Sequence, residues 1–123
     1  MNGRTYPMVG ETANVPFTSN VTPTSILSER VQILEGGYTT NEKLCVFNMK
    51  LKGLKTSSGS PSILSYLPQP VTEASLSCID ITSGISTAIT NSIPCGVGKN
   101  GIMYVQTLTT DSIYAITGVY LIA

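Results

Sequence analysis

Apolar and polar residues alternate at period two along most of the chain after residue 30. The alternation is clearest in residues 44–51, where Cys45, Phe47, Met49 and Leu51 fall on one face and asparagine and lysine on the other. This pattern is typical of a strand with one face buried and the other in solvent. We therefore expect Cys45 to be a packed core thiol rather than a nucleophile.

Further short strands are predicted along the chain, separated by residues that favour turns. Residues 31–35 form a strand that the glycine pair Gly36 and Gly37 is expected to end in a turn. The sequence GKNG at residues 98–101 predicts a hairpin turn. Other strands are expected at residues 86–90, 93–97, 102–108 and 113–122, with a turn at residues 109–112.

Two segments depart from simple alternation. Residues 66–70 contain two prolines that cannot donate ladder hydrogen bonds, which places this crossing at an edge or end of the sheet. In residues 74–81 the apolar face passes from Leu76 and Cys78 to Ile79 and Ile81. That change predicts either a bulge or burial on both faces of the strand.

Short strands at a spacing near ten residues indicate an all-β fold, an antiparallel β-sandwich of jelly-roll-like form. Serine and threonine make up roughly a quarter of the chain and strong helix formers are sparse, which favours the same class. Residues 1–29 contain three prolines and no sustained period, which indicates a stem-like N-terminal arm or linker. Residues 30–123 are then one head domain, a normal size for a single core.

Charge and hydropathy argue against several kinds of partner. Seven basic and seven acidic residues cancel, and no run of lysine or arginine is dense enough to neutralise a phosphate backbone, so nucleic acid is not an expected partner. No apolar run approaches the roughly 20 residues of a membrane helix, and the N-terminus lacks the features of a signal peptide. We expect a protein made in the cytoplasm that does not insert into a membrane.

The residues needed for catalysis and metal binding are sparse. The chain has no histidine, which removes the usual general base and the commonest zinc ligand. Its seven carboxylates are scattered, which argues only weakly against a two-carboxylate glycosidase because such pairs can come from distant strands. Cys45, Cys78 and Cys95 are an odd number at wide spacing, as expected of buried free thiols. The sequence predicts no enzyme, no cofactor and no metal site.

Four residues are candidates for contact with a ligand. With no tryptophan in the chain, stacking against a sugar falls to tyrosines, of which Tyr38 and Tyr66 are expected near the surface. Gln69 lies in the same crossing as Tyr66, and Asp80 fits a turn cap better than a cation ligand. The predicted ligand residues are thus Tyr38, Tyr66, Gln69 and Asp80. The tyrosines inside strands, Tyr104, Tyr114 and Tyr120, are expected in the core or in subunit contacts.

The order of several segments resembles a known family. These are LEGGY at 34–38, the strand at 43–53 ending in LKG, LPQP at 67–70, NGIMYV at 100–105 and ITGVYLI at 116–122. Together they resemble the C-terminal head domains of phage tail fibres and baseplate receptor-binding proteins, over about residues 30 to 123. The resemblance implies a compact antiparallel β-sandwich, usually a homotrimer on a fibre stem, which binds saccharide or teichoic-acid-like polymers on a bacterial surface.

The resemblance implies a place in the virion tail, contacts with other tail proteins and a role in host adsorption through carbohydrate binding. Residues 1–24 lack the collagen-like or heptad repeats that many fibres use to form trimers. The alternative is a purely structural virion subunit, in a fibre, baseplate or head decoration, with no ligand. An enzyme acting on polysaccharide is a third and weaker hypothesis.

Overall fold

The computed structural model describes residues 17, 21, 30–84 and 92–123, and every regular element in these ranges is a β-strand. All six strand pairs are antiparallel, so the predicted all-β antiparallel fold is confirmed. The strands are β1 Val31–Thr40, β2 Leu44–Gly53, β3 Ser62–Leu64, β4 Ala74–Asp80, β5 Cys95–Val97, β6 Met103–Val105 and β7 Ile113–Leu121.

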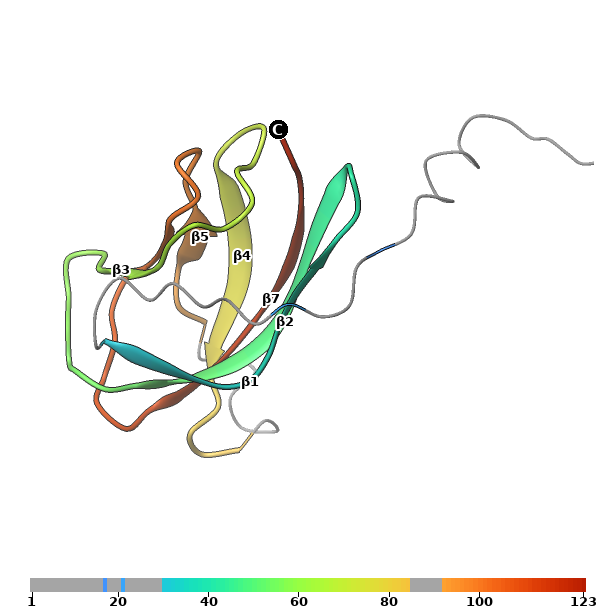
Figure 1. Cartoon of the computed structure of the whole chain (residues 1–123). Coiled ribbons are helices and arrows are strands. Elements are labelled where there is room, and N and C mark those ends of the chain that lie inside the picture. Colours follow the sequence, from blue (N-terminus) through green and yellow to red (C-terminus); the bar gives the residue numbers. More distant parts are fainter. Residues whose placement is uncertain (1–16, 18–20, 22–29, 85–91) are drawn as a thin grey trace, which may run out of the picture.

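The seven strands form one curled sheet in the order β1-β2-β7-β4-β5-β6-β3 (Figure 1). Strand β4 joins the long strands to the short ones: residues 74–76 pair with β5, and residues 77–80 pair with β7. The pairing is continuous, so the two stacked sheets of a sandwich are not separate in the hydrogen-bond pattern. The sandwich itself therefore stays a prediction.

A side chain links the two outermost strands of the curled sheet. Arg30, directly before β1, donates from Nη1 to the carbonyl oxygen of Ser62, the first residue of β3, at 3.1 Å. Since β1 and β3 lie at opposite ends of the strand order, this contact shows how far the sheet curls. The concave side is thereby enclosed.

One hydrophobic core fills the concave side. The predicted inward face of β2 is confirmed, because Cys45, Phe47, Met49 and Leu51 are all at most 2% exposed. Burial of apolar surface contributes roughly 25 cal/mol per Å², which makes this packing the main force that holds the curl. The strands opposite β2 supply Leu76, Cys78, Cys95, Val97, Met103 and Val105, and β7 adds Tyr114, Ile116 and Tyr120.

The prediction of a turn at Gly36 and Gly37 is wrong. Strand β1 continues through both glycines to Thr40, and its register to β2 shifts between Ile33 and Glu35. Gly36 has a positive φ of 81°, and it lies beside this bulge rather than in a chain reversal. The reversal occurs at residues 41–43, where Asn41 Oδ1 accepts the backbone N–H groups of residues 43 and 44, each at 2.7 Å.

The pairing of the strands also explains the two segments, residues 66–70 and 74–81, that depart from simple alternation. Strand β4 keeps a regular register to β7, and Ile79 and Ile81 are half-buried, so burial on both faces applies rather than a bulge. The proline crossing lies at one end of β7, as predicted: Pro70 bridges Ile122, and the N–H of Val71 donates to Leu121. The turns at residues 98–101 and 109–112 are confirmed. The expected strand at residues 86–90 lies outside the described residues.

Of the predicted N-terminal arm, Phe17 and Val21 are described. Val21 exchanges two backbone hydrogen bonds with Tyr38 of β1, at 2.6 and 2.8 Å. At this position the chain before β1 is therefore attached to the edge of the sheet. The domain boundary near residue 30 stays a prediction.

The bulge of β1 can be tested with two glycines of positive φ. A Cβ at Gly36 would overlap the carbonyl of Asn48 and the Cα of Met49 on β2, whereas a Cβ at Gly59, φ 76°, meets nothing within 4 Å. We expect Gly36→Ala to lower the unfolding free energy by about 3 kcal/mol, and Gly59→Ala by only about 1 kcal/mol, the backbone term alone. Urea unfolding measures both. Equal losses would contradict the close approach of β1 and β2.

Candidate functional site

The four predicted ligand residues do not form one site. Asp80 pairs with Tyr114 near the start of β7, while the carbonyl of Gln69 accepts the N–H of Ala123 beyond its other end. Strand β7 has nine residues, so at about 3.3 Å per residue these positions are some 30 Å apart. One small ligand therefore does not reach both.

Tyr38 and Asp80 have structural contacts. The ring of Tyr38 packs against Phe47 with centroids 5.3 Å apart, and burial raises the pKa of its hydroxyl. Asp80 Oδ1 accepts the backbone N–H of Thr82 at 3.0 Å and also its hydroxyl, which confirms the turn-cap interpretation. These contacts account for both residues without a ligand.

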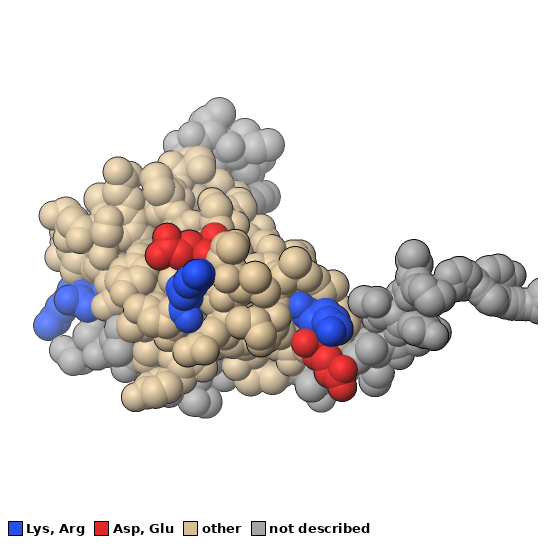
Figure 2. All heavy atoms as spheres, turned by 90° about the horizontal axis from the view of Figure 1, so that it is seen from above, with Lys and Arg blue, Asp and Glu red and all other residues tan. Residues whose placement is uncertain are grey.

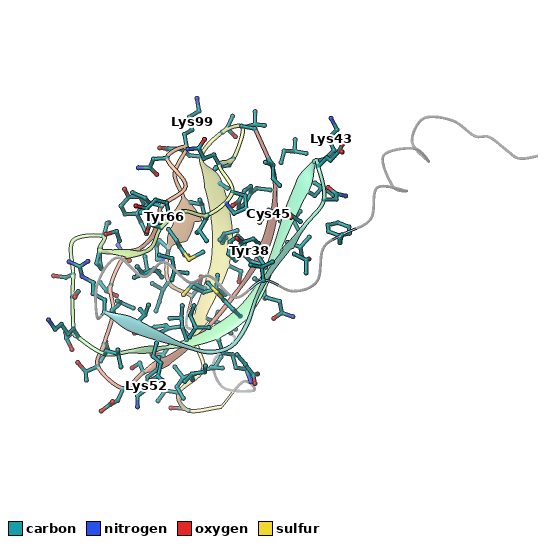
Figure 3. All side chains as sticks on the ribbon, in the orientation of Figure 1. Tyr38, Lys43, Cys45, Lys52, Tyr66 and Lys99 are labelled. Carbon is teal, nitrogen blue, oxygen red and sulfur yellow. The ribbon has the colours of Figure 1, made fainter. Side chains whose placement is uncertain are left out.

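Tyr66 is the most exposed large hydrophobic side chain among the described residues, at 83%. Its φ of 59° is in the left-handed region, which is disfavoured by roughly 1–2 kcal/mol for a residue with a Cβ. The flanking Ser65 and Leu67 are buried, and the N–H of Leu67 donates to Gly101 at 3.0 Å, which fixes Tyr66 beside the β5–β6 hairpin (Figure 3). A strained backbone that presents an aromatic ring to solvent is a feature of binding sites.

A row of small side chains with one aromatic ring crosses the outer face of four strands. Ser75 of β4 pairs with Gly96 of β5, Gly96 pairs with Tyr104 of β6, and Tyr104 pairs with Ser62 of β3. Directly opposed residues in antiparallel strands share a face, so these four lie together outside the core. Tyr104 is half-exposed and is not a core residue.

Two depressions, about 300 Å³ and 320 Å³ in volume, meet at Tyr104. We call them together the Tyr104 groove. The first is lined by Glu73, Ala74, Ser75, Cys95, Gly96, Val97, Gly98 and Tyr104, and the second by Ser60, Pro94, Cys95, Gly96, Tyr104, Val105 and Gln106.

Gly96 lines both depressions of the groove. A Cβ at this position would lie 2.5 Å from the carbonyl oxygen of Ala74, so the close approach of β4 and β5 requires glycine. Strand packing therefore fixes the absence of a side chain at this position, next to Tyr104 on β6.

The β5–β6 hairpin fixes the position of the Tyr104 ring. Asn100 Nδ2 lies 3.4 Å from the hydroxyl of Tyr104, and Asn100 Oδ1 accepts the N–H of Ile102 at 3.1 Å. A Cβ built at Gly98 would lie 3.6 Å from Cε2 of the ring. The ring thus lies beside Gly98 and Asn100 of the hairpin turn.

Tyr104 is not among the predicted ligand residues, because the sequence pattern assigns it to the core or to subunit contacts. A usable signal was present, since Tyr104 stands between Met103 and Val105, which both point inward. Period-two alternation then directs Tyr104 outward. The position of Gly96 opposite Tyr104 is set by the pairing of β5 with β6. No local sequence pattern indicates it.

Charges on the described surface are mixed in sign. Lys50 forms an ion pair with Glu35 at 3.2 Å, and Lys52 with Asp111 at 3.6 Å, so the lysine face of β2 is a solvated, partly neutralised surface. Figure 2 shows basic and acidic side chains interspersed on the end of the molecule seen from above. On this end no single sign dominates.

The three cysteines are free and buried, as predicted. Burial raises the pKa of Cys45 to about 11. The thiol of Cys95 donates to the sulfur of Cys78, which lowers the pKa of Cys78 and, with burial, raises that of Cys95. Within the described ranges, no group of three or more histidine, cysteine or acidic residues is placed to hold a metal ion.

No family model matches the chain, and no curated protein matches its sequence. Across the described residues, no helix is long and apolar enough to cross a bilayer.

The buried thiol predicts a loss of stability at alkaline pH. Cys45 keeps its proton up to about pH 11 in the fold, from an ordinary pKa of 9.0, so the unfolded chain releases its proton first. The free energy of unfolding is expected to fall as pH rises from about 9 to about 11, and Cys45→Ala to flatten part of this fall. Urea unfolding across this range measures both. Stability that rises with pH in this window would contradict the burial of the thiol.

Tyr66 predicts a gain of stability on substitution. Asparagine tolerates the left-handed backbone better than an aromatic residue, so Tyr66→Asn is expected to raise the unfolding free energy by up to about 1 kcal/mol. Tyr104→Asn, on a regular strand, is the control and is expected to lower it. Thermal unfolding measures both variants. A loss of stability in Tyr66→Asn would show that the ring has a packing role.

Proposed function

We propose that the chain is a non-enzymatic binding module that recognises a saccharide on a bacterial cell surface, in the manner of a phage tail-fibre or baseplate receptor-binding head. The observation that carries this proposal is the Tyr104 groove. The exposed and strained Tyr66, next to the residue that bonds Gly101 of the same hairpin, presents a second aromatic ring. The groove combines an aromatic ring, small polar side chains and exposed backbone. These groups suit a hydroxylated ring with apolar faces.

The groove is shallow, which fits weak recognition at each site. Ser75 and Gln106 offer side-chain hydrogen bonds. Repetition across a homotrimer on a virion tail would raise the overall affinity through effective concentration. This is the mode of host adsorption that the resemblance implies.

A non-enzymatic role is supported by the content of the groove. Glu73 is the one carboxylate among its lining residues, and hydrolysis of a glycosidic bond ordinarily needs two. The thiols are buried, and the raised pKa of Cys45 disfavours it as a nucleophile. The groove is better suited to holding a saccharide than to cleaving one.

A structural role in a virion is the second candidate, and one observation favours it. On the outer face of β2 and β7, Val46 pairs with Val119 and Leu44 pairs with Leu121, while the N–H of Val71 donates to Leu121. Val119 and Leu121 are 56% and 59% exposed. A contiguous exposed apolar surface is typical of protein association, here with further copies or other tail proteins. It lies across β4 from the groove, so the two roles are compatible.

The saccharide proposal is tested by removing the ring at the centre of the groove. We expect Tyr104→Ala to weaken binding to cell-wall saccharides of a bacterial host about tenfold, the loss of one aromatic contact of about 1.4 kcal/mol. Val119→Ala, an exposed change on the opposite half of the sheet, is the matched control and is expected to bind as the unchanged protein does. Glycan arrays and binding to purified cell walls measure the effect.

If the unchanged protein binds no cell wall, the saccharide proposal fails and the structural role remains. If Val119→Ala weakens binding and Tyr104→Ala does not, the binding surface lies on β2 and β7 and the assignment to the groove is wrong.

A further inference from the structure

The Tyr104 groove carries an unbalanced charge. Of the described residues that line its two depressions, Glu73 alone has a charged side chain. Glu73 is exposed, and within the described ranges it forms no ion pair. A ligand in the first depression therefore meets a single carboxylate.

Glu73 and the aromatic ring line the same depression. Ala74 pairs with Val97 at the start of β4, and Glu73, Gly98 and Tyr104 are all lining residues of the first depression. Gly98 lies beside the ring of Tyr104, with 3.6 Å between a built Cβ and Cε2. Gly98 itself places no side chain between the carboxylate and the ring, and the side-chain amide of Asn100 is its nearest neighbour there, with Oδ1 2.9 Å from the built Cβ.

A carboxylate beside an aromatic face recognises an ammonium group. The ring attracts a cation at its face by about 0.5–1 kcal/mol at an exposed site, and an exposed ion pair adds about 0.2–1 kcal/mol. Ser75 lines the same depression and can bond the hydroxyl groups of a ligand. A volume near 300 Å³ is at the small end of ligand sites and suits one sugar ring.

The lysines at this end of the molecule do not line the groove. Lys99 is at the tip of the β5–β6 hairpin and Lys43 at the β1–β2 turn (Figure 3). Their effect on a ligand acts through solvent and is screened within about 8–10 Å at moderate salt. Lys99 is next to Gly98. The test must therefore distinguish the effect of the Lys99 charge on ligand binding from the effect of Glu73.

We infer that the Tyr104 groove prefers a saccharide with a free ammonium group, an amino sugar, over its neutral or anionic counterparts. Glu73 pairs with the ammonium while Tyr104 contacts the ring and the cation. The inference rests on the proposed function and names the ligand chemistry of the same site.

The test compares two ligands that differ at one nitrogen, which is a free ammonium in one and a neutral N-acetyl amide in the other. The whole chain is titrated calorimetrically with a glucosamine oligosaccharide and with its N-acetylated counterpart of equal length, at mildly acidic pH where the amines are protonated. We expect the free amine form to bind about fivefold more tightly. Glu73→Gln is expected to remove this preference and to keep the binding of the N-acetylated form. Lys99→Gln, the matched change at a neighbouring cation, is expected to keep or increase the preference.

The possible results distinguish failure of the amino-sugar inference from failure of the proposed saccharide-binding function. Equal binding of both oligosaccharides, or a preference that survives in Glu73→Gln, overturns the inference. Tighter binding of a phosphorylated oligosaccharide, weakened by Lys99→Gln, also overturns it. In each of these cases, weaker binding in Tyr104→Ala leaves the proposed function standing. If the unchanged protein binds host cell walls but neither oligosaccharide, the inference alone fails. If it binds neither the oligosaccharides nor any cell wall, both fail.

Discussion

The structure depends on the burial of one face of a single curled sheet. Each strand directs alternate side chains to the concave side, and the row from Cys45 to Leu51 on β2 meets apolar residues from β4, β5 and β6. The inward-facing residues of the strands make up this core. The outward-facing residues on the same strands therefore do not contribute to core packing. Tyr104 and Ser75 are available for a ligand for the same reason that Met103 and Leu76 are buried.

Glycines at close approaches allow the curl. Gly36 permits the bulge of β1 against β2, and Gly96 permits the approach of β5 to β4. Arg30 then joins the outermost strands through Ser62. The Tyr104 groove is thus coupled to the fold, because Gly96, which lines both of its depressions, is also the residue that strand packing requires.

Much of the fold could be predicted from local patterns, and the site could not. Alternation identified β2 and its inward face, and local turn residues identified the hairpin at residues 98–101. The turn predicted from Gly36 and Gly37 is wrong, because a glycine with positive φ occurs in bulges as well as in turns. Only the pairing of β1 with β2 shows which of the two is present. The groove needs β4, β5, β6 and β3 side by side, and this neighbourhood is set by long-range pairing, which no local pattern contains.

The central claim is that the outer face of the β5–β6 hairpin is the ligand surface. Its most direct test is amide chemical-shift mapping by NMR on the whole chain during titration with a host cell-wall saccharide. The account predicts shifts at Ser75, Gly96, Gly98 and Tyr104, with Val46, Val119 and Leu121 unchanged. Shifts confined to those three residues on β2 and β7 would contradict it.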